Sequence, residues 1–341
     1  MQIGKLDRVP LGVFPTPIQE LKNLGAHFGG PRLFIKRDDL TGLGLGGNKL
    51  RKLEYAMAEA LACGATTVIT IGGPQSNHVR LTTAAANRLG MKTILVLRGE
   101  EPPRVSGNLL IDRILGAAEI HFVGGEGYPS KNELDRIADE KAEQIAARLE
   151  AEGETPYVIP NGCKAIHGAF GYAGCVLETV MQLRAEHLAA DAIVSAVGTS
   201  STLTGLILGS HLHTQGEMDI IGISVAGSAD VLAARIAVQL AEAVERLELD
   251  LEVPRSSIEI FDDYVGAGYG LPTDAMKEAV LLTARSEGVV LDPVYTGKAM
   301  SGLIDLIRSG RFSKDDIVVL LHTGGVPGLF ADTQLETFQS V

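Results

Sequence analysis

The chain has 341 residues, of which 45% are hydrophobic and 21% charged; 30 basic and 42 acidic residues give a formal net charge of −12. This length exceeds the size at which one hydrophobic core usually stops growing, so we expect a globular protein of two domains. The acidic balance argues against nucleic acid or an anionic membrane as a partner. No run of about 18 apolar residues predicts a membrane span, and the N-terminus lacks the apolar run of a signal peptide.

The three cysteines are widely spaced and none belongs to a Cys-x-x-Cys pair; they are Cys63, Cys163 and Cys175. An odd number at such spacings argues against a disulfide framework and against a structural zinc site, and no other metal site is expected. This cysteine usage favours a reducing compartment, so we expect the protein in the cytoplasm.

Short apolar runs alternate with longer amphipathic stretches along the whole chain. In chain order, the predicted strands are Leu33–Lys36, Thr67–Ile71, Thr93–Leu97, Ile120–Val123, Ile193–Val197, Ile220–Val225, Ile258–Phe261 and Ile317–Leu321. The predicted helices include Asn77–Arg88, Asn132–Glu150, Ala169–Arg184, Ala229–Arg246 and Pro272–Ser286. Apolar strands separated by helices predict an α/β protein whose parallel sheets are covered on both faces. The units between about 50 and 155 predict a smaller sheet, and the later strands predict a larger one.

The stretch Gly46-Gly47-Asn48-Lys49 precedes a predicted helix that contains Leu50 and Leu53. The glycines lack a Cβ, so a planar ligand could approach the backbone, and Asn48 is expected to cap the helix. Lys49 lies beside the positive end of the helix and near further cations, which favours a depressed pKa and an amine that attacks a carbonyl. The alternative is a solvated helix start whose cations face water.

The spacing Gly42-x-Gly44-x-x-Gly47 also matches the fingerprint of dinucleotide-binding proteins. That fingerprint requires an acidic residue at the end of the following strand to hold the ribose. The strand Thr67–Ile71 ends in Gly72-Gly73-Pro74-Gln75 and supplies no acid. A nicotinamide cofactor is therefore disfavoured.

A hydroxyl-rich turn follows the predicted strand Ile193–Val197 and opens a predicted helix, Leu203–Leu208; its residues are Gly198, Thr199, Ser200, Ser201 and Thr202. Hydroxyl and backbone donors at a helix N-terminus favour a bound phosphate. The turn lacks the Gly-Lys-Ser/Thr of nucleoside-triphosphate sites. The alternative is an ordinary capped turn between a strand and a helix.

Polar residues also follow two other predicted strands, and ligands of open α/β sheets bind at such carboxyl ends. Ser76, Asn77 and His78 follow the first of these strands, where Asn77 taken alone would be the helix N-cap. His322-Thr323-Gly324-Gly325 follows the second. Tyr269 and Tyr295 lie in predicted loops, where a phenol close to an amine can act as an acid or base.

Together these motifs resemble the fold type II family of pyridoxal-phosphate enzymes, the tryptophan synthase β-like group. Within that group the likeness is to D-cysteine desulfhydrase and 1-aminocyclopropane-1-carboxylate (ACC) deaminase, and it runs from Arg8-Val9-Pro10 to Val326-Pro327. The resemblance implies a pyridoxal 5'-phosphate cofactor, a small amino-acid substrate and two open parallel-sheet αβα domains. The large cofactor-binding domain would comprise residues 1–48 and 166–341, and the small substrate-side domain residues 49–165. A homodimer or higher homo-oligomer is also implied.

The resemblance assigns roles residue by residue. Lys49 would form the Schiff base with the cofactor, and Asn77 would bond its phenolic oxygen. The other cofactor contacts would be Gly198, Thr199, Ser200, Ser201, Thr202, Thr296 and Thr323. The substrate would be bound by Ser76, Asn77, His78, Lys52 and Lys164. The catalytic residues would be Lys49, Ser76, Tyr269 and Tyr295.

Two positions separate the sibling activities. The deaminase pattern has glutamate and leucine where this chain has Thr296 and Thr323. A carboxylate beside the pyridine nitrogen strengthens the ring as an electron sink, which opening a cyclopropane would use. Neutral threonines therefore favour α,β-elimination from a cysteine-type amino acid, and we expect D-cysteine as the substrate, with sulfide, pyruvate and ammonia as products.

Three alternatives stay open on the sequence. Lys164 and His167 fall where the desulfhydrase pattern is small and neutral, and such donors would suit the sulfonate of an L-cysteate sulfo-lyase. ACC deaminase is the second alternative. The third is a protein that binds the cofactor or an amino acid without catalysis, because a fold does not fix a function.

Overall fold

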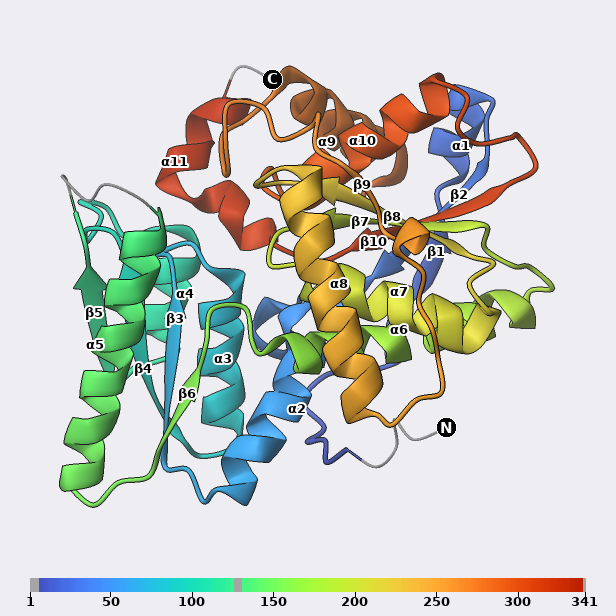
Figure 1. Cartoon of the computed structure of the whole chain (residues 1–341). Coiled ribbons are helices and arrows are strands. Elements are labelled where there is room, and N and C mark those ends of the chain that lie inside the picture. The colour runs from blue at the N-terminus through green and yellow to red at the C-terminus, as the bar shows by residue number, and fades with distance from the viewer. Residues whose placement is uncertain (1–5, 126–130, 340–341) are drawn as a thin grey trace.

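The computed structural model of the chain describes residues 6–125 and 131–339. The prediction that the N-terminus lacks a signal peptide concerns residues that lie partly outside these ranges. The described strands form two separate sheets (Figure 1). A six-stranded sheet has the order β1-β2-β10-β7-β8-β9, with bounds β1 Ile18–Glu20, β2 Arg32–Arg37, β10 Ile317–His322, β7 Ala192–Val197, β8 Asp219–Ser224 and β9 Glu259–Phe261. A four-stranded sheet has the order β5-β4-β3-β6, with bounds β5 Glu119–Val123, β4 Lys92–Arg98, β3 Thr67–Gly72 and β6 Pro156–Ile159.

Each strand predicted from an apolar run is present, and the α/β class is confirmed. Two strands were not predicted, β1 and β6, because β1 has a single apolar residue, Ile18, and β6 begins with a proline. The expectation of purely parallel sheets is wrong at one edge, since β1 pairs antiparallel with β2. An antiparallel edge strand on an otherwise parallel sheet is common in α/β folds.

Helices cover both faces of the large sheet. One face packs on α1 (Lys22–Phe28), α9 (Asp274–Glu287) and α10 (Thr296–Arg308), and the other on α6 (Ala165–Ala185), α7 (Ser201–Thr214) and α8 (Ala229–Arg246). Leu33 and Ile35 of β2 enter the first core, whereas Phe34 enters the second. This alternation follows from the two-residue period of a strand.

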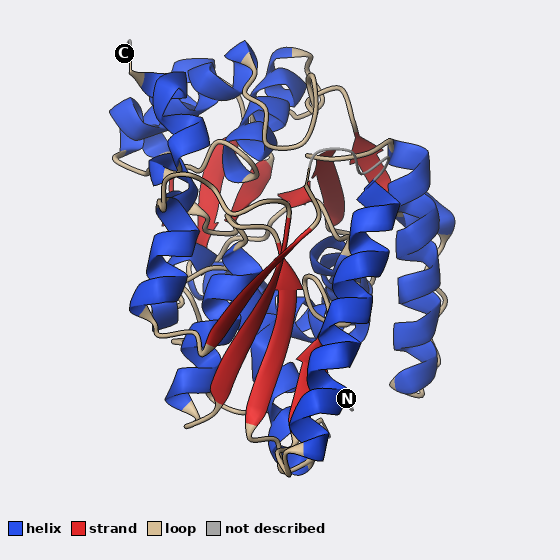
Figure 2. Ribbon diagram, turned by 90° about the vertical axis from the view of Figure 1, so that its left-hand side faces the viewer, coloured by secondary structure: helices blue, strands red, loops and turns tan. Residues whose placement is uncertain are grey.

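The small sheet is a three-layer unit of the same kind, and its strands twist together in Figure 2. One face packs on α5 (Lys131–Ala151), and the other on α2 (Lys49–Ala62), α3 (Asn77–Arg88) and α4 (Gly107–Ile114). Helix α2 joins the two units, since Leu50 and Leu53 enter the small-sheet core while Tyr55 packs on Phe170 of α6. On this division of strands we propose domains of residues 1–48 plus 166–341 and 49–165.

Short helical turns complete the chain: η2 (Asp38–Leu40), η3 (Leu43–Leu45), η4 (Arg255–Ser257), η5 (Val326–Phe330), α11 (Asp332–Leu335) and η6 (Glu336–Phe338). Among the helices of the described ranges, none combines the length and apolar character that crossing a bilayer requires. Strands β2, β10 and β7 are adjacent and parallel, so their carboxyl ends meet at one edge of the large sheet. The segments that follow these three ends carry Lys49, Thr323 and the hydroxyl-rich turn.

Candidate functional site

The loop before Lys49 is fixed by the protein's own backbone. Gly46 has φ 69°, and a Cβ there would collide with the carbonyl oxygen of Asp39. Gly47 has φ 130°, and its amide donates to Thr41 Oγ1 at 2.8 Å. The amide of Asn48 donates to the carbonyl of Thr323 at 2.9 Å. Both glycines are therefore required by internal packing, and the interpretation that they clear space for a planar ligand is not needed to explain them.

Asn48 precedes α2 but its side chain makes no capping hydrogen bond, so the predicted cap is wrong. Its own φ and ψ are helical, whereas an N-cap side chain reaches the helix amides from an extended backbone. The side-chain Nδ2 of Asn48 instead donates to Thr202 Oγ1 at 3.4 Å. This bond ties the loop before Lys49 to the hydroxyl-rich turn 154 residues later in the chain.

Lys49 and Lys52 lie one helical turn apart on α2 and contact each other. Burial lowers the pKa of Lys49, while the nearby Cys163 and Lys52 act in the opposite direction. Burial and the charge of Lys49 lower the pKa of Lys52 well below its usual range. Within the described part of the chain neither ammonium pairs with a carboxylate, and burial raises the pKa of the Cys163 thiol to about 12. This pair of buried amines therefore lacks an anion that the protein itself could supply.

The hydroxyl-rich turn faces this pair. Lys52 Nζ donates to Ser201 Oγ at 2.7 Å, and Lys52 is fully buried. Ser200 has φ 72° and precedes α7, and its buried hydroxyl has no hydrogen-bond partner in the described structure. Thr199 and Gly198 connect this turn to β7. An orphaned hydroxyl, the N-terminus of a 14-residue helix and a buried lysine together fit a phosphate-bearing ligand.

The segment after β3 differs from its prediction in one respect. Ser76, rather than Asn77, is the N-cap of α3, and its Oγ accepts from the Val79 amide at 3.3 Å. Asn77 is the first helical residue, and its Oδ1 accepts from Asn108 Nδ2 at 2.9 Å. Because the oxygen of this amide is held by protein donors, its NH₂ group is the end left to donate to a ligand.

The side chain of His78 is buried against β3, which argues against a contact with the substrate. The ring is 2% exposed and its Nε2 lies 3.2 Å from Thr70 Oγ1 of β3. Burial and the charges of Lys49 and Lys52 lower the pKa of His78 to about 3. His78 is the second residue of α3, and its ring points toward β3. The imidazole is therefore a neutral group in the core.

Tyr269 and Tyr295 come together across 26 residues of sequence. Their hydroxyls share a hydrogen bond, and the ring centroids lie 6.0 Å apart in an edge-on arrangement. Tyr269 exposes 58% of its surface, yet its hydroxyl end is desolvated and its pKa is raised. Burial and the neighbouring phenol raise the pKa of Tyr295 well above its usual value. Both phenols therefore carry their protons at neutral pH and can donate them.

Asp292 holds the turn that presents Tyr295. Its carboxylate is 1% exposed and accepts from the amides of Val294, Tyr295 and Thr296 at 2.9, 2.9 and 2.8 Å. Thr296 Oγ1 donates to the same carboxylate at 2.7 Å and accepts from the Asp292 amide at 2.8 Å. The Thr296 hydroxyl thus has its proton engaged by Asp292. Thr323 Oγ1 forms no protein hydrogen bond in the described structure, so it is the threonine hydroxyl with a proton to offer a ligand.

Lys164 and His167 are engaged by a carboxylate, which argues against both as substrate ligands. Lys164 Nζ lies 2.7 Å from Glu59 Oε2, and His167 Nε2 lies 2.9 Å from Glu59 Oε1. Burial alone would raise the pKa of Glu59, but the bonds from His167, Lys164 and Tyr157 lower it to about 2. The side chain of Lys164 is 48% exposed.

We predict that Lys164→Ala leaves kcat/KM within about twofold of the parent protein, since exposed ion pairs contribute at most about 1 kcal/mol. Steady-state kinetics on the preferred substrate measure this directly. A tenfold or larger rise in KM would return Lys164 to the substrate site.

Sequence reasoning missed Asp292, Arg80 and Asn108, which contact the predicted residues from behind. Arg80 is fully buried on α3, and its helix neighbours one turn away include Asn77 and Thr83, so no apolar pattern marked it as a core residue. Asn108 lies at the start of α4, 31 residues from Asn77, and no local pattern marks it.

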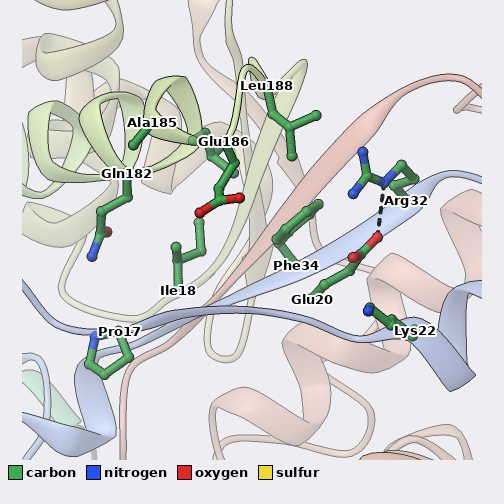
Figure 3. Close-up of a pocket in the computed structure, with 11 residues that line it drawn as sticks. Pro17, Ile18, Glu20, Lys22, Arg32, Phe34, Gln182, Ala185, Glu186 and Leu188 are labelled. Carbon is green, nitrogen blue, oxygen red and sulfur yellow. Dashed lines mark hydrogen bonds and ion pairs between the residues drawn. The ribbon is translucent and has the colours of Figure 1, made fainter.

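Two cavities lie apart from this cluster. One of about 710 Å³ borders the β1 edge of the large sheet, where Arg32 pairs with Glu20 and lies over the ring of Phe34 (Figure 3). The other, of about 570 Å³, is an apolar groove between Leu45, Leu110 and Phe330. None of the predicted site residues lines either cavity. The polar cluster around Lys49 is the candidate site because of its buried lysines, the unpartnered Ser200 hydroxyl and the N-terminus of α7.

Comparison with known proteins identifies relatives along nearly the whole chain. A family described as pyridoxal-phosphate dependent enzyme matches residues 9–324. The chain is 40% identical over 337 residues to D-cysteine desulfhydrase of Salmonella paratyphi C, covering 96% of this chain and 97% of that protein. It is 40% identical over 328 residues to a Pyrococcus horikoshii protein provisionally named 1-aminocyclopropane-1-carboxylate deaminase, covering 96% and 94%. A solved structure described as an ACC deaminase homologue superposes with a TM-score of 0.86 at 39% identity, covering 98% of this chain and 97% of the other.

Proposed function

The chain belongs to the family of pyridoxal-phosphate dependent enzymes, and from this premise we propose that it is a carbon–sulfur lyase acting on D-cysteine. Its relatives carry the names D-cysteine desulfhydrase and ACC deaminase. The chain is a pyridoxal-phosphate dependent lyase of the family that these proteins form. The proposed reaction consumes D-cysteine and one water and releases pyruvate, ammonia and hydrogen sulfide.

The residues around Lys49 fit the cofactor. In this proposal Ser200, Ser201 and the backbone at the start of α7 hold its phosphate, with Lys52 behind Ser201. The NH₂ group of Asn77, whose oxygen accepts from Asn108, would be free to donate to its phenolic oxygen. Thr323 would contact the ring, and Lys49 would supply the amine that bonds to the cofactor. When bound, pyridoxal phosphate supplies an electron sink for the charge left on Cα when the α-proton is removed.

The chain's own groups handle the protons. The lowered pKa of Lys49 favours the neutral amine, which is the form that accepts the α-proton. Ser76 lies at the N-terminus of α3, where the positive end of the helix favours a substrate carboxylate. The two joined phenols of Tyr269 and Tyr295 are protonated, so one of them can donate to the sulfur as it leaves.

Thr296 and Thr323 are the residues on which the proposed substrate depends. The deaminase pattern has glutamate and leucine at these positions, whereas here both side chains are neutral hydroxyls and that of Thr296 donates to Asp292. A pyridine nitrogen without a carboxylate partner is a weaker electron sink. Elimination of a good leaving group from the β-carbon needs less withdrawal than opening of a cyclopropane, which supports D-cysteine over ACC.

The test is to supply the purified holoenzyme with D-cysteine, ACC and L-cysteate in parallel. Keto acid, ammonia, sulfide and sulfite are measured in each reaction. We expect pyruvate and sulfide from D-cysteine alone. Oxobutyrate from ACC as the main product would make the protein a deaminase, and sulfite from L-cysteate would make it a sulfo-lyase. Cofactor binding without product from any of the three would support a non-catalytic protein.

We predict that Lys52→Met weakens cofactor binding by about tenfold or more, because a buried amine that the phosphate would hold in its protonated form is lost. The unfolding free energy of the cofactor-free protein should not fall, since the buried amine has no carboxylate partner there. Titration of the apoenzyme with pyridoxal 5'-phosphate measures the first effect, and urea unfolding measures the second. Unchanged affinity would show that Lys52 does not serve the phosphate.

A further inference from the structure

The guanidinium of Arg80 connects the loop before Lys49 to the amide of Asn77. Arg80 Nη1 donates to the carbonyl of Gly44, and Nη2 donates to the carbonyl of Gly46 at 3.1 Å. On the other side, Nε donates to Asn108 Oδ1 at 2.7 Å, and Nη2 reaches Asn77 Oδ1 at 3.4 Å. One planar group from α3 thus contacts both segments that are proposed to touch the cofactor.

Asn108 completes this connection from α4. Its Nδ2 donates to Asn77 Oδ1 at 2.9 Å and to the carbonyl of Gln75 at 2.9 Å. Since an amide nitrogen cannot accept a hydrogen bond, the orientation of Asn108 is set by Arg80 Nε on its oxygen. The orientation of Asn77 follows from the same chain of bonds, because two donors meet its oxygen and turn its NH₂ group away from them.

Asp112 is the acidic residue whose charge acts on Arg80 in the core. It lies four residues after Asn108 on α4, so both side chains project from one face of that helix. Arg80, Asn108 and Asp112 are all fully buried, and neither carboxylate oxygen of Asp112 has a hydrogen-bond partner in the described structure. Burial raises the pKa of Asp112 to about 7 and lowers that of Arg80 to about 10, each partly opposed by the other's charge. Arg80 therefore remains a cation at neutral pH.

We propose that Arg80 is a positioning residue that fixes the distance between the Lys49 loop and the Asn77 amide, and so aims Asn77 at the cofactor's phenolic oxygen. The proposal rests on the proposed roles of Lys49 and Asn77. Lysine cannot replace it, because an ammonium is a single point donor and cannot hold two carbonyls and an amide oxygen in one plane. Asn108 transmits the orientation to Asn77.

The test compares Arg80→Lys with Arg88→Lys, an exposed arginine on the same helix that serves as the matched control. Apoenzyme is titrated with pyridoxal 5'-phosphate, and the visible absorbance of the holoenzyme is followed against pH. Loss of a donor to the phenolic oxygen leaves more negative charge beside the proton on Lys49 nitrogen, so the pH midpoint should rise by about half a unit or more. We also expect roughly tenfold weaker cofactor binding from the displaced loop. Arg88→Lys should change neither.

Asn77→Ala gives the reference shift, and Asn108→Ala removes the relay to Asn77 while keeping both glycine carbonyl bonds, in case Arg80→Lys does not fold. A rise in midpoint in Asn108→Ala that matches Asn77→Ala supports the relay. If Asn77→Ala shifts the midpoint while Arg80→Lys and Asn108→Ala leave it at the parent value, Arg80 has no positioning role. If Asn77→Ala itself shifts nothing, the proposed role of Asn77 fails, and the inference about Arg80 fails with it.

Discussion

Lys49→Ala is expected to lower turnover by about 10³-fold or more and to abolish the covalent link to the cofactor. The amine acts twice in the proposed reaction, as the group bonded to the cofactor and as the base for the α-proton. Its position one turn before Lys52, with a pKa lowered by burial, suits both uses. The neighbouring amine of Lys52 donates to Ser201 on the hydroxyl-rich turn, so we expect it not to take over the role of Lys49.

The measurement combines steady-state kinetics with borohydride reduction followed by peptide mapping. The parent holoenzyme should carry a reduced cofactor on the peptide that contains Lys49, and the variant should carry none. Lys314→Ala, which removes an exposed lysine, is the control and should retain both activity and the adduct. If the Lys49 variant still forms a borohydride-stable adduct at one site, the assignment of the nucleophile is wrong.

Arg51→Met is expected to lower the unfolding free energy by about 3–5 kcal/mol near neutral pH, because it leaves a buried carboxylate without its partner. Arg51 is 4% exposed and donates to both oxygens of Asp38, through Nε at 2.7 Å and Nη2 at 2.8 Å. It also bonds Glu178 and lies over the ring of Phe14. These contacts tie the helix of Lys49 to the end of β2, so the substitution should also disturb the site.

The loss should depend on pH in a stated direction. Burial alone would raise the pKa of Asp38, but the charge and hydrogen bonds of Arg51 lower it below its usual value. In the parent protein, Asp38 therefore adds stability that is present above the unfolded pKa and is lost as the pH falls through the folded pKa. In the variant the remaining effect of burial raises the pKa of Asp38, so protonation relieves the unpaired charge as the pH falls. The difference between parent and variant should thus be smaller near pH 5 than near pH 7.

Urea unfolding of both proteins at the two pH values measures this difference. The double variant Asp38→Asn, Arg51→Met is the control, since replacing both partners removes the unpaired charge and should recover part of the stability. A loss that is equal at both pH values, or unrelieved in the double variant, would contradict a charge-pair origin.

The sequence by itself determined eight of the ten described strands, the α/β class and the polar residues that follow the strand ends. Apolar runs such as Ile193–Val197 and Ile317–Leu321 indicate a buried strand from their own residues alone. Parallel strands of one sheet have their carboxyl ends at the same edge, but the pairing of β10 with both β2 and β7 is what brings the segments of Lys49, Ser200 and Thr323 together.

The tertiary structure decided which partner each polar side chain has. Ser76 rather than Asn77 caps α3, Lys164 pairs with Glu59, and Asn77 is turned by Asn108. The ion pair of Lys164 with Glu59 spans 105 residues and the hydrogen bond of Asn108 to Asn77 spans 31, so no local pattern indicates them. Side-chain spacing within an element follows from its own period, whereas a hydrogen bond between elements depends on where the packed cores place them. The orientation of the site residues is therefore a property of the folded protein as a whole.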